Sequence, residues 1–116
     1  MKLLETQFLF TKLLPRLFDH AYARGYNLTL GEAHRTPEQA ALNAKSGKGI
    51  KNSLHIKRLA IDLNLFKNGK LLQNSEDHKF LGEFWEQLGK KEGVPTRWGG
   101  RFKDGNHYSI EFEGVK

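Results

Sequence analysis

The chain has 116 residues, a formal net charge of +6 and no cysteine. This length fits one domain with a hydrophobic core of its own, so we expect a single domain over residues 1–116. The absence of cysteine excludes disulfides and thiolate metal sites, and any metal must be held by His, Asp or Glu. The positive charge favours an anionic partner, such as nucleic acid, lipid headgroups or a cell-wall polymer, without choosing among them.

The N-terminal segment combines an apolar start with early charges. Residues 5–7 interrupt the apolar run, and neither a small-x-small cleavage site nor a membrane-length apolar stretch is present. We expect a chain made in the cytoplasm without a secretion signal and without stable membrane insertion. Apolar residues at helical spacing predict a helix over about residues 6–24, with Pro15 either kinking it or starting a second helix and Gly25 ending it.

The middle of the chain alternates between strand and helix signals. YNLTLGEAHR (26–35) predicts a short strand that runs into a loop, and Thr36 and Pro37 are typical of the cap and first position of a helix over TPEQAALNAK. SGKGIKNS (46–53) predicts a flexible loop. RLAIDLNLFKNGKLL (58–72) is the clearest strand signal, because apolar residues alternate with others and Asn68-Gly69 favours a type I′ hairpin turn.

The C-terminal part predicts one more helix and one more strand. SEDHKFLGEFWEQLGKKEG (75–93) has Ser75 as the expected cap and Gly93 just beyond the helix end, and a strand follows over about residues 106–113. His20 and His78, in the two long helices, are expected to face solvent. Mixed helices and strands with hairpin signals, rather than regular βαβ units, indicate an α+β fold built on an antiparallel sheet.

Strand alternation brings possible metal ligands together. Asp62 lies opposite the leucines of its strand, and His107 lies opposite the apolar residues of the last strand, so both side chains project from one face of the sheet. His55 precedes the first of these strands. Two imidazoles and one carboxylate with an open position are a ligand set of catalytic zinc. Spacing alone leaves the alternative that His107 is an ordinary polar residue. An Asp among apolar neighbours, such as Asp62, is rarer and more often has a cation or a metal as its partner, because an unpaired buried carboxylate is costly.

Three motifs resemble those of one enzyme group. SLHIKRLAIDL resembles the Ser-x-His-x6-Asp motif of the zinc D,D-peptidases and L-alanyl-D-glutamate peptidases, the LAS group, which includes phage endolysins. WGGRFKDGNH resembles the second motif of the group, and EAHRTPEQ resembles its early segment with an Arg and a Gln. The motifs occur in the same order as in the group. The resemblance implies a small α+β domain of the Hedgehog/DD-peptidase type.

The resemblance also implies roles for individual residues. His55, Asp62 and His107 would bind Zn²⁺. Asp104 would be the general base that takes a proton from the attacking water and later protonates the leaving amine. Arg35 would hold a substrate carboxylate or stabilise the oxyanion.

Three further residues are expected to support the ligands or to line the substrate pocket, namely Ser53, Gln39 and Trp98, although Trp98 fits the core equally well. The chain departs from the group at two positions. Arg58 stands where many members have glycine, which requires a different local backbone or an outward side chain. His34 stands in place of the usual Tyr, which concerns the substrate pocket rather than the metal.

These observations indicate zinc-dependent hydrolysis of an amide bond in the peptidoglycan stem peptide. The favoured interpretation is a monomeric L-alanyl-D-glutamate endopeptidase that acts in phage or prophage lysis. Such an enzyme would reach the cell wall through a holin or a similar pore. A D,D-carboxypeptidase that cuts D-alanyl-D-alanine is the alternative on the same fold. A small basic metal-dependent nuclease is a second alternative, suggested by EDHKF and GNHYS, although no nucleic acid partner is expected. Asp104 argues against a third, a non-catalytic wall-binding module.

Overall fold

A computed structural model describes residues 1–47 and 53–116, and the predicted loop at 46–53 lies largely outside these residues. Its helices are α1 (Leu3–Ala23), α2 (Pro37–Lys45) and α3 (Lys79–Glu92), joined by the 3-10 turns η1 (Leu54–Lys57), η2 (Ser75–His78) and η3 (Gly99–Phe102). Its strands are β1 (Asn27–Leu30), β2 (Ala60–Lys67), β3 (Lys70–Leu72), β4 (Thr96–Trp98) and β5 (His107–Ile110). They form one antiparallel sheet in the order β1-β2-β5-β4, with β3 paired to β2. The predicted α+β architecture is confirmed.

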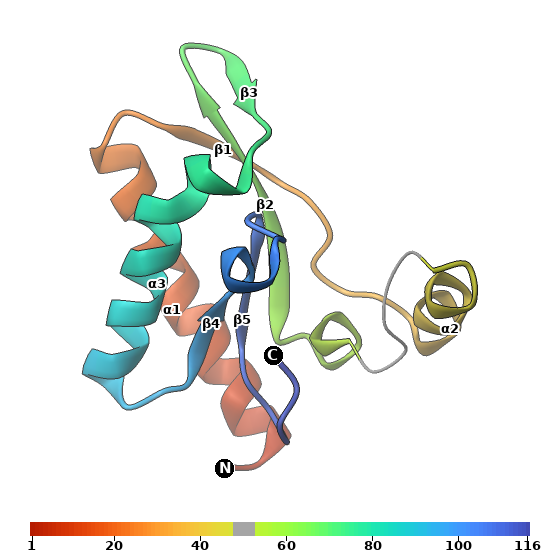
Figure 1. The fold of residues 1–116 in the computed structure, drawn as a ribbon. Coiled ribbons are helices and arrows are strands. Elements are labelled where there is room, and N and C mark those ends of the chain that lie inside the picture. Colours follow the sequence, from red (N-terminus) through yellow and green to blue (C-terminus); the bar gives the residue numbers. More distant parts are fainter. Residues whose placement is uncertain (48–52) are drawn as a thin grey trace.

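The sheet is covered on one face by two helices. Figure 1 shows α1 and α3 side by side against the sheet, with α2 apart on the other side. The core between the helices and the sheet contains the fully buried side chains of Leu17, Leu63, Leu65, Trp85 and Tyr108. Since this core takes the apolar face of β2 and β5, the opposite face of both strands is left for polar side chains. No helix among the described residues combines the length and the apolar character that crossing a membrane requires.

Several element boundaries differ from those expected. Pro15 lies inside one continuous helix, so it neither starts a second helix nor ends the first. Ser75 is not a helix cap, because the chain first makes the turn η2, and its Oγ instead accepts a hydrogen bond from Gly105 N at 3.0 Å. Strand β4 was not predicted, and the last strand ends at Ile110, earlier than expected. Short segments such as these owe their pairing to neighbouring strands, which local sequence does not reveal.

The expectation that His20 and His78 face solvent is wrong. His78 is 3% exposed, and its Nδ1 lies 2.7 Å from the hydroxyl oxygen of Tyr108. His20 is partly buried and stacks on Phe84, with 3.9 Å between ring centroids. Both histidines are therefore packed side chains of the fold, outside the candidate site.

Candidate active site

Two of the three candidate ligands face each other on neighbouring strands. Asp62 of β2 is paired directly with His107 of β5 in the antiparallel register, so both side chains leave the sheet on the same face, as the alternation predicts. His107 Nδ1 lies 3.5 Å from Asp62 Oδ1. On its other side, His107 Nε2 lies 3.3 Å from the main-chain oxygen of Lys116. The inner nitrogen of His107 is therefore Nδ1.

His55 reaches the same point from the turn η1. The Ser53 Oγ accepts a hydrogen bond from the His55 backbone N–H at 3.1 Å and caps the turn. His55 Nδ1 lies 3.2 Å from the carbonyl oxygen of Ala33, and Nε2 lies 3.3 Å from Asp62 Oδ1. Metal-binding histidines commonly donate their outer ring N–H to a carbonyl or carboxylate, which orients the inner nitrogen toward the metal. Both histidines of the cluster have this arrangement.

The carboxylate oxygen between the two imidazoles, Asp62 Oδ1, is the atom whose surroundings most favour a bound cation. Asp62 Oδ1 is buried, and it has no hydrogen-bond partner among the described residues. Ligand atoms of His55, Asp62 and His107 all lie within 4.8 Å of one another. An unsatisfied buried polar atom costs about 1–3 kcal/mol, and a metal ion bound by the three residues would remove that cost. Two nitrogens and one oxygen, with a position left for substrate or water, fit zinc.

Asp104 lies beside this cluster because the Trp-Gly-Gly segment folds the chain back on itself. The Asp104 N–H donates to the Gly99 carbonyl at 2.8 Å, and the His107 N–H donates to the Asp104 carbonyl at 3.0 Å. A Cβ atom on Gly99 would lie 2.1 Å from the Asp104 carbonyl oxygen and 2.7 Å from His107 Cβ, so this close approach requires glycine. Asp104 Oδ2 lies 3.9 Å from His107 Nδ1, and 52% of its side chain remains exposed.

The two aspartates of the site have opposite electrostatic environments. Burial would raise the pKa of Asp62, but the two imidazoles beside its carboxylate, those of His107 and His55, outweigh burial and lower that pKa to about 2. Burial raises the pKa of Asp104, and the nearby charge of Asp62 adds to this rise, while His107, His55 and Arg35 oppose it without cancelling it. Asp62 is therefore held in its anionic form, whereas the environment of Asp104 favours its protonated form more than that of a free carboxyl group.

Arg35 is held at the edge of the cluster by a glutamate that the sequence did not point to. The Arg35 N–H donates to the His55 carbonyl at 3.1 Å. Arg35 Nε donates to Glu32 Oε1 at 2.8 Å, and Nη2 contacts the same oxygen. Glu32 is in turn tied to the sheet, because its carbonyl accepts the Asp62 N–H at 2.8 Å. A glutamate three residues before an arginine in an extended segment has no recognisable pattern, which is why its role was missed.

These groups open onto one cavity of about 490 Å³. The lining comprises Arg35, Ser53, Leu54, His55, Asp62, Phe102, Asp104, His107, Val115 and Lys116. The volume falls within the roughly 300–1,000 Å³ of typical ligand sites. The three candidate ligands, the Asp104 carboxylate and the Arg35 guanidinium therefore share one space large enough for a short peptide segment.

The structure brings one of the three remaining predicted residues to this cavity. Ser53 lines it and caps the turn that carries His55. Gln39 is exposed on α2 and donates its amide N–H to Asn43 Oδ1 at 2.8 Å. Trp98 is a core residue, 5% exposed, whose Nε1–H donates to the Gly105 carbonyl at 2.7 Å. Neither Gln39 nor Trp98 lines the cavity, so the geometry gives neither of them contact with the ligands.

The two departures from the motif pattern have simple structural outcomes. Arg58 ends η1 in the left-handed region, with φ of 56°, and its side chain is exposed. The backbone therefore keeps the left-handed conformation that favours glycine. Of the two alternatives expected for Arg58, a different backbone or an outward side chain, the second is confirmed. His34 is exposed and does not line the cavity.

Comparisons with known proteins agree with this fold. The structure is similar to that of the Serratia marcescens L-Ala D-Glu endopeptidase ChiX, with a TM-score of 0.69 and 19% identity over 85% of this chain and 78% of that one. A search of curated protein sequences found no match. The family model described as phage L-alanyl-D-glutamate peptidase matches residues 13–115. The chain therefore belongs to the phage L-alanyl-D-glutamate peptidase family and is a peptidoglycan peptidase.

Proposed function

We propose that the protein is a zinc-dependent L-alanyl-D-glutamate endopeptidase, which hydrolyses the amide bond between L-alanine and D-glutamate in the peptidoglycan stem. The observation that carries this proposal is the convergence of His55 and His107 on one unpartnered carboxylate oxygen of Asp62, with Asp104 alongside. Family membership supports the peptidase activity. The donor set, which contains no sulfur and leaves an open position, supports zinc.

The residues of the chain would divide the reaction among them. Zinc held by the three ligands would polarise the scissile carbonyl and make water acidic enough to be deprotonated near neutral pH. Asp104 Oδ2 would accept the proton of the attacking water, whose oxygen bonds to the carbonyl carbon. When the C–N bond breaks, Asp104 would return that proton to the leaving nitrogen of D-glutamate. The raised pKa and the exposure of Asp104 support this double role.

Arg35 would bind a carboxylate of the substrate. Its side chain is 13% exposed and lines the cavity, while Glu32 fixes one edge of the guanidinium. The other N–H groups can donate to an anionic group of D-glutamate or of the residue after it, since charged hydrogen bonds of this kind are the strong ones. In this assignment Arg35 orients the peptide, and Ser53 acts by orienting His55.

The proposed setting is cell lysis by a phage or prophage. The family of the chain supports this setting, and the net charge of +6 would favour approach to an anionic envelope. In this proposal the chain acts as a one-domain monomer, does not bind nucleic acid, and reaches the wall after release through a holin-type pore. Loss of lysis when the gene is expressed without a pore-forming partner would support the last point.

Digestion of purified peptidoglycan, with mass analysis of the fragments, tests the bond that is cut. New N-terminal glutamyl ends are expected. Release of D-alanine would instead identify the D,D-carboxypeptidase, and a protein that hydrolyses DNA but not peptidoglycan would contradict the peptidase assignment. Metal analysis of protein purified without added metal should find one zinc per chain, and a different metal in that amount would overturn the zinc assignment while leaving the peptidase intact.

A further inference from the structure

A second cavity, of about 310 Å³, shares Asp104 with the ligand cavity. Its walls are the middle of β2, the end of β3, residues 73 and 74, the turn η2 and residues 103–106. Asn64 lies on the same face of β2 as Asp62, two residues away, and Asn106 directly precedes His107. The second cavity is therefore a continuation of the metal-ligand face of the sheet, on the side where Asp104 lies.

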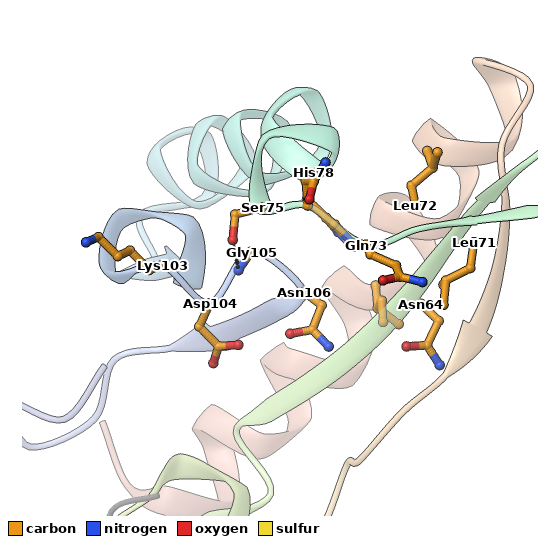
Figure 2. A pocket seen from close by; sticks show the side chains of 12 residues that line it. Asn64, Leu71, Leu72, Gln73, Ser75, His78, Lys103, Asp104, Gly105 and Asn106 are labelled. Carbon is orange, nitrogen blue, oxygen red and sulfur yellow. Dashed lines mark hydrogen bonds between the residues drawn. The ribbon is translucent and has the colours of Figure 1, made fainter. Parts of the chain in front are cut away.

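The chemistry of this second cavity is that of a neutral polar site. Figure 2 shows the amides of Asn64, Gln73 and Asn106 around one space, with Leu71 and Leu72 of β3 beside them. Asn64 donates one N–H to Thr29 Oγ1 at 3.1 Å. Among the residues that Figure 2 draws, no hydrogen bond joins Gln73 or Asn106 to a neighbour through its amide. These side chains can therefore offer N–H donors and carbonyl acceptors to a ligand.

Charge separates the two cavities. Arg35 and Lys116 line the ligand cavity. The charged residues that line the second cavity are Asp104 and Lys103, and Figure 2 shows the Lys103 amine pointing away from Asn106. An anionic peptide placed in the second cavity would meet the Asp104 carboxylate without an inward cation to compensate, which disfavours it.

We infer that the second cavity binds the N-acetylmuramoyl sugar to which the stem peptide is attached. The inference rests on the proposed function, because that function defines which groups flank the cut bond. The stem carries its carboxylates on the D-glutamyl side, where Arg35 would bind them, and an uncharged acetamido sugar on the L-alanyl side. Amides are suited to the hydroxyl and acetamido groups of a sugar, and the leucine wall is suited to its C–H face and acetyl methyl group.

Two substrates matched in charge test the inference. One is N-acetylmuramoyl-L-alanyl-γ-D-glutamyl-diaminopimelate. Its lactyl carboxyl group forms the amide to L-alanine and so adds no charge to the peptide. The other is the same peptide with a simple N-acetyl cap on L-alanine. The parent protein should cleave the sugar-bearing substrate with a kcat/KM higher by tenfold or more. Gln73→Ala and Asn106→Ala should each reduce kcat/KM for that substrate by about two- to tenfold, the worth of one neutral hydrogen bond, and change the capped peptide little.

Gln87→Ala, an exposed glutamine on α3 outside both cavities, is the matched control and should leave both rates as in the parent. Zinc content and melting temperature are measured for each variant, because Asn106 directly precedes the proposed ligand His107 and its substitution could disturb the metal site. Gln73 is exposed and is not adjacent in sequence to any of the three proposed ligands. The sugar assignment would be overturned if the parent cleaved the two substrates with equal kcat/KM. It would also be overturned if Gln73→Ala lowered kcat/KM by the same factor for both substrates. Neither result would contradict the proposed endopeptidase activity. Cleavage of neither substrate would overturn the endopeptidase proposal and the sugar site together.

Discussion

The candidate site has two halves that are built differently. Asp62 and His107 belong to paired strands, and the antiparallel register alone places them opposite each other. His55 and Arg35 belong to connecting segments, and individual hydrogen bonds hold them: the Ser53 cap, a carbonyl acceptor and a glutamate. The sheet half has one geometry as long as the fold exists, since a slip of either strand by one residue would turn the side chain on that strand into the core. In the loop half, by contrast, a substitution that removes one hydrogen bond can shift one side chain without changing the rest of the site.

This difference suggests that the sheet residues and Arg35 have different functions. A ligand atom has to be placed to within a few tenths of an ångström, and the ladder does this for the carboxylate that the two histidines share. Groups that bind a variable substrate are commonly carried on loops. Substitutions of the proposed ligands, Asp62 and His107 in the sheet half and His55 in the loop half, should therefore remove the metal. Substitution of Arg35 should alter substrate handling and leave the metal in place.

Asp62→Asn should have the largest effect. The amide is neutral and a weaker ligand, so the zinc content should fall far below one per chain and peptidoglycan hydrolysis should be lost with it. Chelation of the parent protein should give the same result, reversed by added zinc. Elemental analysis and fragment analysis of digested peptidoglycan are the measurements.

Asp19→Asn is the control for this change, because Asp19 is exposed on α1 outside the ligand cavity. It should keep both metal and activity. An Asp62→Asn protein that still holds stoichiometric zinc and turns over would show that the carboxylate is not a ligand, and that its burial without a hydrogen bond has another cause.

Asp104→Asn should have the next largest effect, and it separates chemistry from metal binding. The amide keeps the shape of the side chain but cannot accept a proton, so turnover should fall by roughly 10²–10⁴-fold, the usual worth of a positioned acid–base group. Zinc content should equal that of the parent. The melting temperature should stay or rise slightly, because a partly buried carboxylate with a raised pKa is replaced by a neutral group.

Asp104→Glu provides the comparison for this variant. It keeps the acid but displaces it by one methylene, so a fraction of the activity should survive. Near-parental turnover by Asp104→Asn would mean that another group accepts the proton. Loss of zinc from Asp104→Asn would mean that Asp104 is a ligand rather than a base.

The sequence allowed the sheet half of the site to be predicted more fully than the loop half. Alternation along two strands was enough to place Asp62 and His107 on one face, because a side-chain period of two leaves no other choice once the apolar face is buried. The Trp-Gly-Gly segment was matched only as part of a family motif, and the structure adds the physical reason for its glycine, since a Cβ on Gly99 would collide with Asp104 and His107. The α+β fold followed from the order of the elements.

What could not be predicted depends on contacts between distant segments. Glu32 acquires its role only when the chain beyond β1 lies next to Asp62. Trp98 enters the core because Gly82 of α3 and Gly100 leave room for its ring. His78 is buried because a tyrosine hydroxyl thirty positions later in the chain lies next to it. None of these contacts leaves a periodicity or a short motif in the sequence.

Arg35→Ala should have a smaller effect than either aspartate variant. Removing hydrogen bonds to a substrate carboxylate should lower kcat/KM by roughly 10–100-fold, as expected for bonds to charged groups worth about 1.5–3 kcal/mol. Zinc content and melting temperature should change little, because Arg35 is not one of the three proposed ligands. Glu32→Gln should give a weaker version of the same defect, since it loosens the guanidinium without removing it.

Arg16→Ala is the matched control, because Arg16 pairs with Glu92 at 2.5 Å on the exposed surface. Such surface pairs are worth about 0–1 kcal/mol, so this variant should retain parental kinetics. If Arg35→Ala loses zinc or melts much earlier than the parent, the arginine is a structural element of the turn that carries His55, and its assignment to the substrate is wrong.

His78→Gln should have the smallest effect, and it contrasts a structural histidine with those of the site. Burial lowers the pKa of His78 below its usual value of 6.5, although Asp77 opposes this. Above about pH 6.5 the imidazole is neutral in both states, so its full contribution to stability is present. Below that pH the unfolded chain takes up a proton before the folded chain does, and the free energy of unfolding falls.

Glutamine can still hydrogen-bond to the Tyr108 hydroxyl but does not titrate. At about pH 7.5 the variant should therefore be less stable than the parent by on the order of 1 kcal/mol, the worth of an imperfectly replaced hydrogen bond. The gap should narrow as the pH is lowered to about 5.5, because only the parent loses stability through this group. Urea unfolding of zinc-loaded proteins across this range is the measurement, and His34→Gln, at an exposed position, is the control whose gap to the parent should stay near zero. A gap between parent and His78→Gln that is constant with pH would show that the buried imidazole does not titrate differently in the folded and unfolded chain.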